Sequence, residues 1–434
     1  MLGAALGLTL SASGQSSDAL LDKLVDKGIL TVKEANDLRE ESDKNFTTAY
    51  QTKSGMPDWV TSFKINGDLR LRYENFSFED PNTATRNRFR YRARLGFTAV
   101  MKDQFEVGMR LTSSEPADGG DSSFGGDPIS GNTTFQNNGS KKNVYFDAAY
   151  GKWTPLNTSE WVGTVIAGKM DNPFVFPSTM MFDRDYTPEG AAVELAFRPS
   201  AAHTIKFTGG GFVLDEVNGS NGNPYTFGGQ LRWDAVWNTR ISSSLGVSGF
   251  DIVNKDGLIT AAVPNQSYGN TRTTAGRLVN DYNPIEADAS LTYTLDKFPL
   301  YKGAFPITGF AEFIHNPAAS TRNSGYAAGV YFGKAGKKGT WDIAYQYRSM
   351  EGDPWYEEVT ESDFGANYIT APTGGSSGYR YGTNVRGHIF KAQWSPYDAV
   401  TLTVQYFLTE LIDPSPAGSK SGAGRLQVDT TLKF

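Results

Sequence analysis

Cysteine is absent from the 434-residue sequence, so neither a disulfide framework nor a cysteine-based metal site is available to the fold. Histidine is scarce as well: His203, His315 and His388 lie far apart, and no His-Glu-x-x-His pair occurs. A barrel hydrolase built on His315 would need a serine partner, which the sequence does not identify. We therefore predict no catalytic residues, no metal site and no cofactor, and we do not expect an enzyme.

Long hydrophobic runs are also missing. No stretch of about 18 apolar residues occurs, which excludes a transmembrane helix in the mature chain. The formal net charge of −6 argues against nucleic acid as a partner, because nucleic-acid-binding domains are usually basic. Aromatic residues make up 13% of the chain and glycine occupies 47 positions. A membrane β-barrel with a polar lumen has such a composition, and so does a soluble all-β repeat protein.

The first 60 residues differ from the remainder. Residues 1–14 form an apolar segment that ends in small residues, which is typical of a secretory signal peptide, although no Lys or Arg precedes the apolar run. Residues 15–60 predict a periplasmic helical hairpin and a linker, with a capping box at Thr31 to Glu34. So short a hairpin cannot bury a core alone. It would either self-associate, for example as a trimer, or pack against the mouth of a barrel.

From Thr61 onward, apolar and polar residues alternate with a period of two, which predicts β-strands. About sixteen strands are expected, an even number within the range of single-chain outer-membrane barrels. The predicted strands are 61–75, 86–99, 104–113, 142–153, 161–170, 190–198, 203–214, 225–237, 241–251, 284–295, 303–315, 325–333, 340–349, 384–394, 399–410 and 425–434.

The segments between these strands alternate in length. Short turns such as 199–202 and 395–398 alternate along the chain with long segments such as 114–141 and 350–383. Short periplasmic turns opposite long external loops are typical of a transmembrane barrel, whereas a soluble sandwich has no reason to sort its loops. Aromatic residues near the short turns predict an interface belt: Trp153, Trp161, Trp233, Trp237, Phe298, Tyr301, Trp394 and Tyr397.

The last predicted strand, 425–434, alternates without a break and ends on Phe434. Taken alone it is an ordinary amphipathic strand of a sandwich or the closing strand of a barrel. In the second case it would pair with the strand 61–75, so that Asp429 and Lys433 line the lumen. The segment is similar to the closing strand of outer-membrane barrels, and the resemblance implies that Phe434 serves as an insertion signal.

The first candidate functional feature is a column of arginines. Every second residue from 86 to 94 is Arg, and the intervening residues from Phe89 onward are mainly apolar, so the five guanidinium groups share one strand face over roughly 26 Å. An Arg on the lipid face would cost about 2–4 kcal/mol, so the column should face the lumen. The predicted pore-lining selectivity residues are Arg70, Arg72, Arg86, Arg88, Arg90, Arg92 and Arg94.

Two interpretations of this column remain open. It can be an electrostatic track that concentrates anionic solutes in a water-filled lumen. Alternatively, the arginines can pair with lumenal carboxylates such as Asp68, Glu74 and Glu106 and only stiffen the wall.

The third long connection, residues 171–190, is apolar in its middle and acidic towards its end. An external loop with buried-type residues should pack against something. Either it folds into the lumen, as the third loop of general porins does, or it packs at a subunit interface. The constriction residues expected in the first case are Asp171, Asp183, Arg184, Asp185 and Glu189.

Residues 61–434 resemble the putative porin family of Gram-negative outer membranes, which is related to general and phosphate-selective porins. The segments that carry the resemblance are 88–97, 168–174, 183–190 and the Phe434 end. It implies a trimeric outer-membrane channel, surrounded by lipid, through which small hydrophilic solutes diffuse. The arginine column adds a preference for anions. The alternative is a barrel that tethers the cell envelope or binds a partner through its N-terminal helices.

Overall fold

The computed structural model describes residues 56–434 apart from 82–83, 118–123, 218–221, 265–267, 366–381 and 415–420. Within the predicted helical hairpin it describes only Leu24, Glu34 and Leu38, each with helical backbone. The predicted signal peptide and most of the hairpin and linker therefore lie outside the described residues. None of the described helices is long and apolar enough to cross a membrane.

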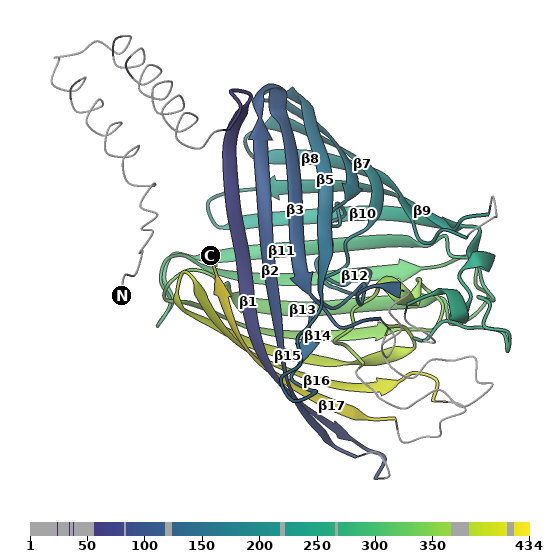
Figure 1. Ribbon diagram of the computed structural model, residues 1–434. Helices are drawn as coiled ribbons and strands as arrows, with labels where there is room; N and C mark the ends of the chain where they lie inside the picture. The colour runs from purple at the N-terminus through teal and green to yellow at the C-terminus, as the bar shows by residue number, and fades with distance from the viewer. Residues whose placement is uncertain are drawn as a thin grey trace, which may run out of the picture. The chain divides into compact units, whose positions relative to one another are not determined.

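Residues 64–98 and 103–434 form one compact unit, and its strands form an antiparallel sheet (Figure 1). The sheet has 17 strands in the described part of the chain. One of them, β4, has only two residues, which leaves sixteen long strands. Their bounds are β1 Val60–Phe78, β2 Arg86–Met101, β3 Phe105–Ser113, β4 Thr133–Thr134, β5 Val144–Asn157, β6 Trp161–Lys169, β7 Glu189–Ser200, β8 His203–Val213, β9 Tyr225–Val236, β10 Ile241–Val253, β11 Ile285–Leu295, β12 Phe305–His315, β13 Ser324–Gly333, β14 Thr340–Met350, β15 Val385–Tyr397, β16 Val400–Leu411 and β17 Ala423–Lys433.

The sheet closes on itself through its first and last strands. β17 pairs with β16 on one side and with β1 on the other, in a register that runs from Asp68 opposite Lys433 to Phe78 opposite Ala423. At the end of this seam Gly67 and Phe434 exchange two backbone hydrogen bonds of 3.0 and 3.1 Å. A Cβ atom on Gly67 would lie 2.4 Å from the Phe434 ring and 2.5 Å from the backbone oxygen of Arg94, so the position requires glycine. Closure confirms the predicted sixteen-stranded barrel.

Side chains alternate between two environments along each strand. On β1 the odd-numbered Leu69 and Leu71 are exposed on the outer face, while Arg72 and Glu74 are buried on the inner face. The same alternation separates Val404 from Gln405 on β16. A barrel in lipid requires an apolar outer face and tolerates polar groups only in the lumen, and the period-two pattern of the sequence supplies both.

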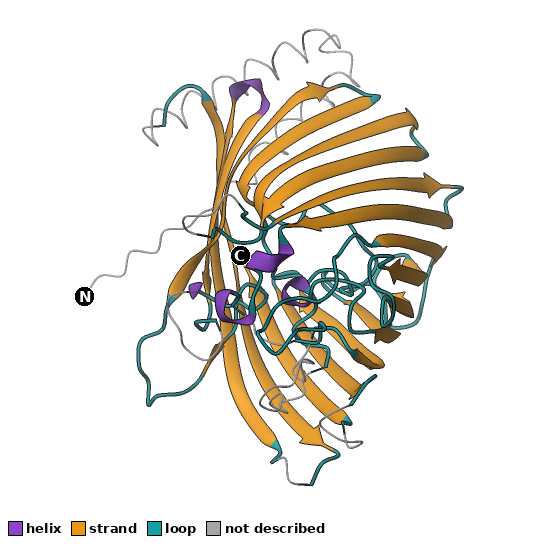
Figure 2. Cartoon of the chain, turned by 90° about the vertical axis from the view of Figure 1, so that its right-hand side faces the viewer, coloured by secondary structure: helices purple, strands orange, loops and turns teal. Residues whose placement is uncertain are grey.

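The connections differ in length at the two ends of the strands, as expected. Those between β7 and β8 and between β15 and β16 are tight turns, whereas residues 114–143, 254–284 and 351–384 are long. Figure 2 shows the long loops, in teal, gathered between the strands. The described aromatic residues of the predicted belt lie near the tight turns, with Trp233 and Trp237 in edge-to-face contact. This placement agrees with an interface belt.

Three long loops build an apolar core inside the barrel. One buried cluster contains Met180 and Met181 of the loop 170–188, Leu258 of the loop 254–284, Trp355 of the loop 351–384 and Phe250 on the inner face of β10. The rings of Phe250 and Trp355 lie 5.2 Å apart. The apolar middle of the third long connection therefore packs inside the barrel, and its burial positions the acidic end of the loop.

Substitutions of two neighbouring residues test which face of β16 meets lipid. We expect Val404→Arg to lower the free energy of unfolding by about 2–4 kcal/mol, because it places a charge on the lipid face near mid-strand. Gln405→Arg introduces the same side chain into the lumen and should cost much less. The measurement is urea-induced unfolding of the barrel in lipid vesicles. Equal losses for the two variants would contradict the assignment of the faces.

Candidate functional site

The arginines of β2 lie on the lumenal face of the barrel. Arg90 and Arg92 are buried, Arg88 and Arg94 are half-buried, and Phe89 between them is exposed on the outer face. Arg86 is the first residue of β2, directly after the loop 79–85, and its side chain is exposed. Arg70 and Arg72 extend the group on the adjacent β1, and Arg425 adds a member from β17.

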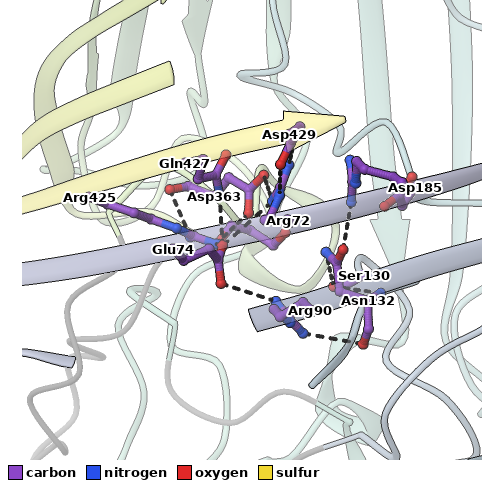
Figure 3. A network of polar contacts seen from close by, with 12 residues as sticks. Arg72, Glu74, Arg90, Ser130, Asn132, Asp185, Asp363, Arg425, Gln427 and Asp429 are labelled. Atoms are coloured by element: carbon purple, nitrogen blue, oxygen red, sulfur yellow. Dashed lines mark hydrogen bonds and ion pairs between the residues drawn. The ribbon is translucent and has the colours of Figure 1, made fainter. Parts of the chain in front are cut away.

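Glu74 lies at the centre of an ion network that joins the three strands (Figure 3). Its carboxylate is fully buried and accepts hydrogen bonds from Arg88, Arg425 and Gln427. Arg90 Nη1 lies 3.9 Å from the same carboxylate. Such a network satisfies buried charges that would otherwise be expensive to remove from water. It connects β1, β2 and β17 at the point where the barrel closes.

Arg72 links this network to a loop. Its Nε and Nη2 atoms donate to the two carboxylate oxygens of Asp429 at 2.8 Å, a bidentate geometry, and its Nη1 donates to Asp363 at 3.0 Å. Arg425 Nη2 also donates to Asp363, at 2.7 Å. Asp363 belongs to the loop 351–384, which is thereby fixed to the seam.

Further along the column, Arg92 and Arg94 share two carboxylates. Arg92 donates to Asp68 at 3.1 Å and to Asp185 at 2.6 Å, and Arg94 donates to Asp68 at 2.7 Å. The sequence suggested three carboxylates as partners that would only stiffen the wall, and two of them, Asp68 and Glu74, do pair with arginines. Glu106 does not: it pairs with Lys152 at 3.0 Å and accepts a hydrogen bond from Tyr150.

The loop 170–188 is held against the opposite wall. Ser178 donates to Glu312 of β12 at 2.6 Å, Arg348 of β14 donates to Thr179 at 2.8 Å, and the side chain of Gln230 on β9 exchanges two hydrogen bonds with the backbone of Val175. Since Asp185 of the same loop pairs with Arg92 on β2, the loop is attached to both sides of the lumen.

The five predicted loop residues occupy different places. Asp183, Arg184 and Asp185 line a cavity beside the arginine column. Asp171 instead pairs with Arg110 at 2.6 Å, and Glu189 pairs with Lys169 at 3.0 Å. Neither Asp171 nor Glu189 lines that cavity. Asp185 contacts the column directly and does not face it across open space.

The two aspartates of the loop have opposite electrostatic environments. Burial raises the pKa of the Asp183 carboxyl well above its usual range, and the nearby Glu361 and Asp185 add like charge. Burial acts in the same direction on Asp185, but Arg92, Arg70 and Arg94 outweigh it and lower the pKa of this carboxyl. Asp185 is therefore the ionised partner of the column, whereas Asp183 loses its proton at a higher pH than an exposed aspartate does.

The cavity has a volume of about 320 Å³. Two of its arginines have no carboxylate partner among the described residues: Arg70 donates only to Asn132, at 2.7 Å, and Arg184 forms no ion pair. The lining residues are Arg70, Arg72, Arg92, Arg94, Asn132, Ser178, Thr179, Asp183, Arg184, Asp185, Tyr331, Ala344, Gln346, Glu361, Ser362, Asp363, Ile389, Lys391, Gln393, Thr403, Gln405, Asp429 and Thr431.

A second cavity, of about 580 Å³, has a different charge. Its lining includes Glu189, Asp215 and Glu216, and among its other lining residues carboxylates outnumber the single lysine, Lys169. Asp185 lines both cavities. The lumen therefore presents an acidic region next to a cavity whose lining carries six basic and five acidic side chains.

His315 has the serine neighbour that sequence reasoning did not identify. Its Nδ1 atom lies 3.0 Å from Ser324 Oγ, and the two residues are directly opposite on β12 and β13. Ser324 Oγ also donates to Asn323, so the asparagine does not orient the imidazole as the third member of a catalytic triad would. The contact is a cross-strand pair on an exposed face.

The closed barrel, its apolar outer face and the inward-folded loops around a charged lumen define an outer-membrane channel of the porin class. Residues 81–278 match a family model described as "Putative porin", so this part of the chain is similar to that family. Proteins of this class are channels for small solutes and not enzymes. The predicted localisation in a Gram-negative outer membrane is confirmed.

Solved porin structures are similar to this chain at low sequence identity. OprB of Pseudomonas putida is 11% identical, with 88% of this chain and 96% of that chain covered and a TM-score of 0.53. OmpF of Salmonella typhi is also 11% identical, with 86% and 97% covered and a TM-score of 0.48. No curated protein matches the chain.

The Glu74 network predicts a large effect of one substitution. Glu74→Ala leaves several arginines buried without their carboxylate, so we expect it to lower the free energy of unfolding by about 3–5 kcal/mol. Glu106→Ala, which removes a partly exposed ion pair with Lys152, should cost about 0–1 kcal/mol. Urea titration of both variants in vesicles gives the comparison. A Glu74→Ala variant as stable as Glu106→Ala would show that the network is dispensable.

The raised pKa of Asp183 predicts a pH dependence of loop packing. The pKa of Asp183 in the folded protein lies above its unfolded value of about 3.9. Its contribution to the free energy of unfolding is therefore complete below the unfolded pKa and is lost as pH rises through the folded pKa. Hydrogen exchange at residues 359–365 should accelerate over that range, because the Val359 carbonyl and the Ser362 N–H of this segment bond to Asp183. Asp183→Asn cannot ionise and should lose this dependence, although it also loses one acceptor oxygen. An unchanged pH profile in the variant would refute the assignment.

Proposed function

We propose that this channel admits small hydrophilic solutes and prefers anions, and that the lumenal arginines set this preference. The observation that carries the proposal is the pair Arg70 and Arg184, which line the cavity without a carboxylate partner among the described residues. Arg184 belongs to the loop 170–188, and most arginines of the column other than Arg70 are neutralised by ion pairs. The preference therefore depends on the uncompensated charges more than on the number of arginines.

The paired arginines contribute in a second way. Because Asp68, Asp185, Asp363 and Asp429 are all engaged by guanidinium groups, these carboxylates oppose an entering anion less than free ones would. A charge in a narrow lumen is screened over about 8 Å at physiological ionic strength, so groups that line the cavity dominate its selectivity. The opposing charge is Glu361, which forms no ion pair within the described residues and lines the same cavity.

We expect the channel to assemble as a homotrimer and Phe434 to act as the insertion signal, with residues 1–14 removed as a signal peptide. The alternative of an envelope tether depends on residues 15–60, most of which lie outside the described part of the chain.

Reversal potentials across a potassium chloride gradient test the proposal. The double variant Arg70→Gln/Arg184→Gln should shift the potential towards cation preference, because it removes the two uncompensated positive charges. Glu361→Gln should shift it in the opposite direction. Lys206→Gln is the matched control: it removes a lumenal positive charge that is paired with Glu194 and does not line the cavity.

The outcome that would overturn the proposal is a double variant whose potential equals that of the wild type. A shift in Lys206→Gln as large as in the double variant would show that net lumenal charge, and not the cavity, sets selectivity.

A further inference from the structure

The cavity holds a buried side chain with unused hydrogen-bonding capacity. Gln346 on β14 is only 7% exposed, and its Nε2 atom has no hydrogen-bond partner. A buried amide without a partner is costly, so a ligand that supplies the partner would be favoured there. Because Gln346 lines the cavity, a solute in the cavity can supply the missing partner.

The wall around Gln346 is mainly polar. Strands β13 to β17 contribute side chains that carry amide or hydroxyl groups: Tyr331, Gln346, Gln393, Thr403, Gln405 and Thr431. The two charged side chains on these strands that line the cavity are both in ion pairs, Lys391 with Asp342 at 3.5 Å and Asp429 with Arg72 at 2.8 Å. Amide and hydroxyl groups both donate and accept hydrogen bonds, and so do the hydroxyl groups of a polyol. This wall therefore suits a solute with several hydroxyl groups better than a bare inorganic ion.

The other side of the cavity is suited to an anionic group. Arg70 and Arg184 have no carboxylate partner within the described residues, and guanidinium groups bind carboxylates and phosphates in bidentate geometry. One cavity thus combines an anion-binding side with a wall that recognises hydroxyl groups. Its volume of about 320 Å³ lies at the lower end of the range for small-molecule sites.

We propose that this cavity is a saturable binding site for a small anion that also carries several hydroxyl groups, of the sugar-acid class. The inference rests on the proposed anion preference and extends it, because a site that binds its solute discriminates by chemistry as well as by charge. The anionic group lies towards Arg70 and Arg184, and the hydroxyl groups contact Gln346 and the other amide and hydroxyl side chains of the wall.

The test uses the full-length protein in planar bilayers and three probes. Glucuronate carries both features, glucose has the hydroxyl groups without the charge, and acetate has the charge without the hydroxyl groups. Glucuronate should reduce the single-channel current in a saturable manner. Glucose and acetate should each need a concentration about tenfold higher or more for half-maximal block, since each lacks one set of hydrogen bonds.

Variants assign the block to the cavity. Gln346→Ala and Arg70→Gln should each raise the half-blocking concentration of glucuronate by about tenfold. Gln346→Ala should act less on acetate than on glucuronate, because acetate lacks the hydroxyl groups. Lys206→Gln, outside the cavity, should leave the glucuronate block unchanged.

The results separate this inference from the proposed function. Anion preference without saturable glucuronate block, or with equal block by acetate, overturns the binding site and leaves the selectivity standing. Glucuronate block that depends on Gln346, in a channel without anion preference, supports the site and refutes the selectivity. Block that survives both Gln346→Ala and Arg70→Gln overturns the assignment to this cavity.

Discussion

The buried carboxylate of Glu74 is the contact on which the arrangement of the lumen depends. It accepts hydrogen bonds from arginines on β2 and β17 while itself belonging to β1, so it joins the strands at which the barrel closes. A closed sheet in lipid must direct its polar groups inward, and like charges gathered there repel unless carboxylates separate them. The Glu74 network meets both requirements and holds the seam together.

This arrangement changes what the arginine column can do. Arg72, Arg88, Arg92 and Arg94 are engaged in ion pairs, so they fix the seam and the two loops that carry Asp185 and Asp363. We propose that solute selection falls to arginines outside these ion pairs. The paired arginines build the cavity, and the two without carboxylate partners, Arg70 and Arg184, leave a positive charge within it.

The sequence predicted those features that depend on local periodicity. The strands, the lumenal face of the column and the pairing of the last strand with the first follow from period-two alternation and from the cost of a charge in lipid. The contacts that the loops make could not be predicted from this pattern. Asp363 lies in a loop without periodicity, and only the fold brings it to Arg72 and Arg425. The lumenal position of Arg425 could have been predicted from the sequence, because Arg425 shares the lumenal face of the last strand with Asp429.

The reversal potential of the wild-type channel in a potassium chloride gradient tests the central claim most directly. The uncompensated charges of Arg70 and Arg184 predict that chloride is the more permeant ion. A potential of the opposite sign, with potassium preferred, would mean that the acidic region lined by Glu189, Asp215 and Glu216 controls the channel, and it would contradict the role assigned to the arginines.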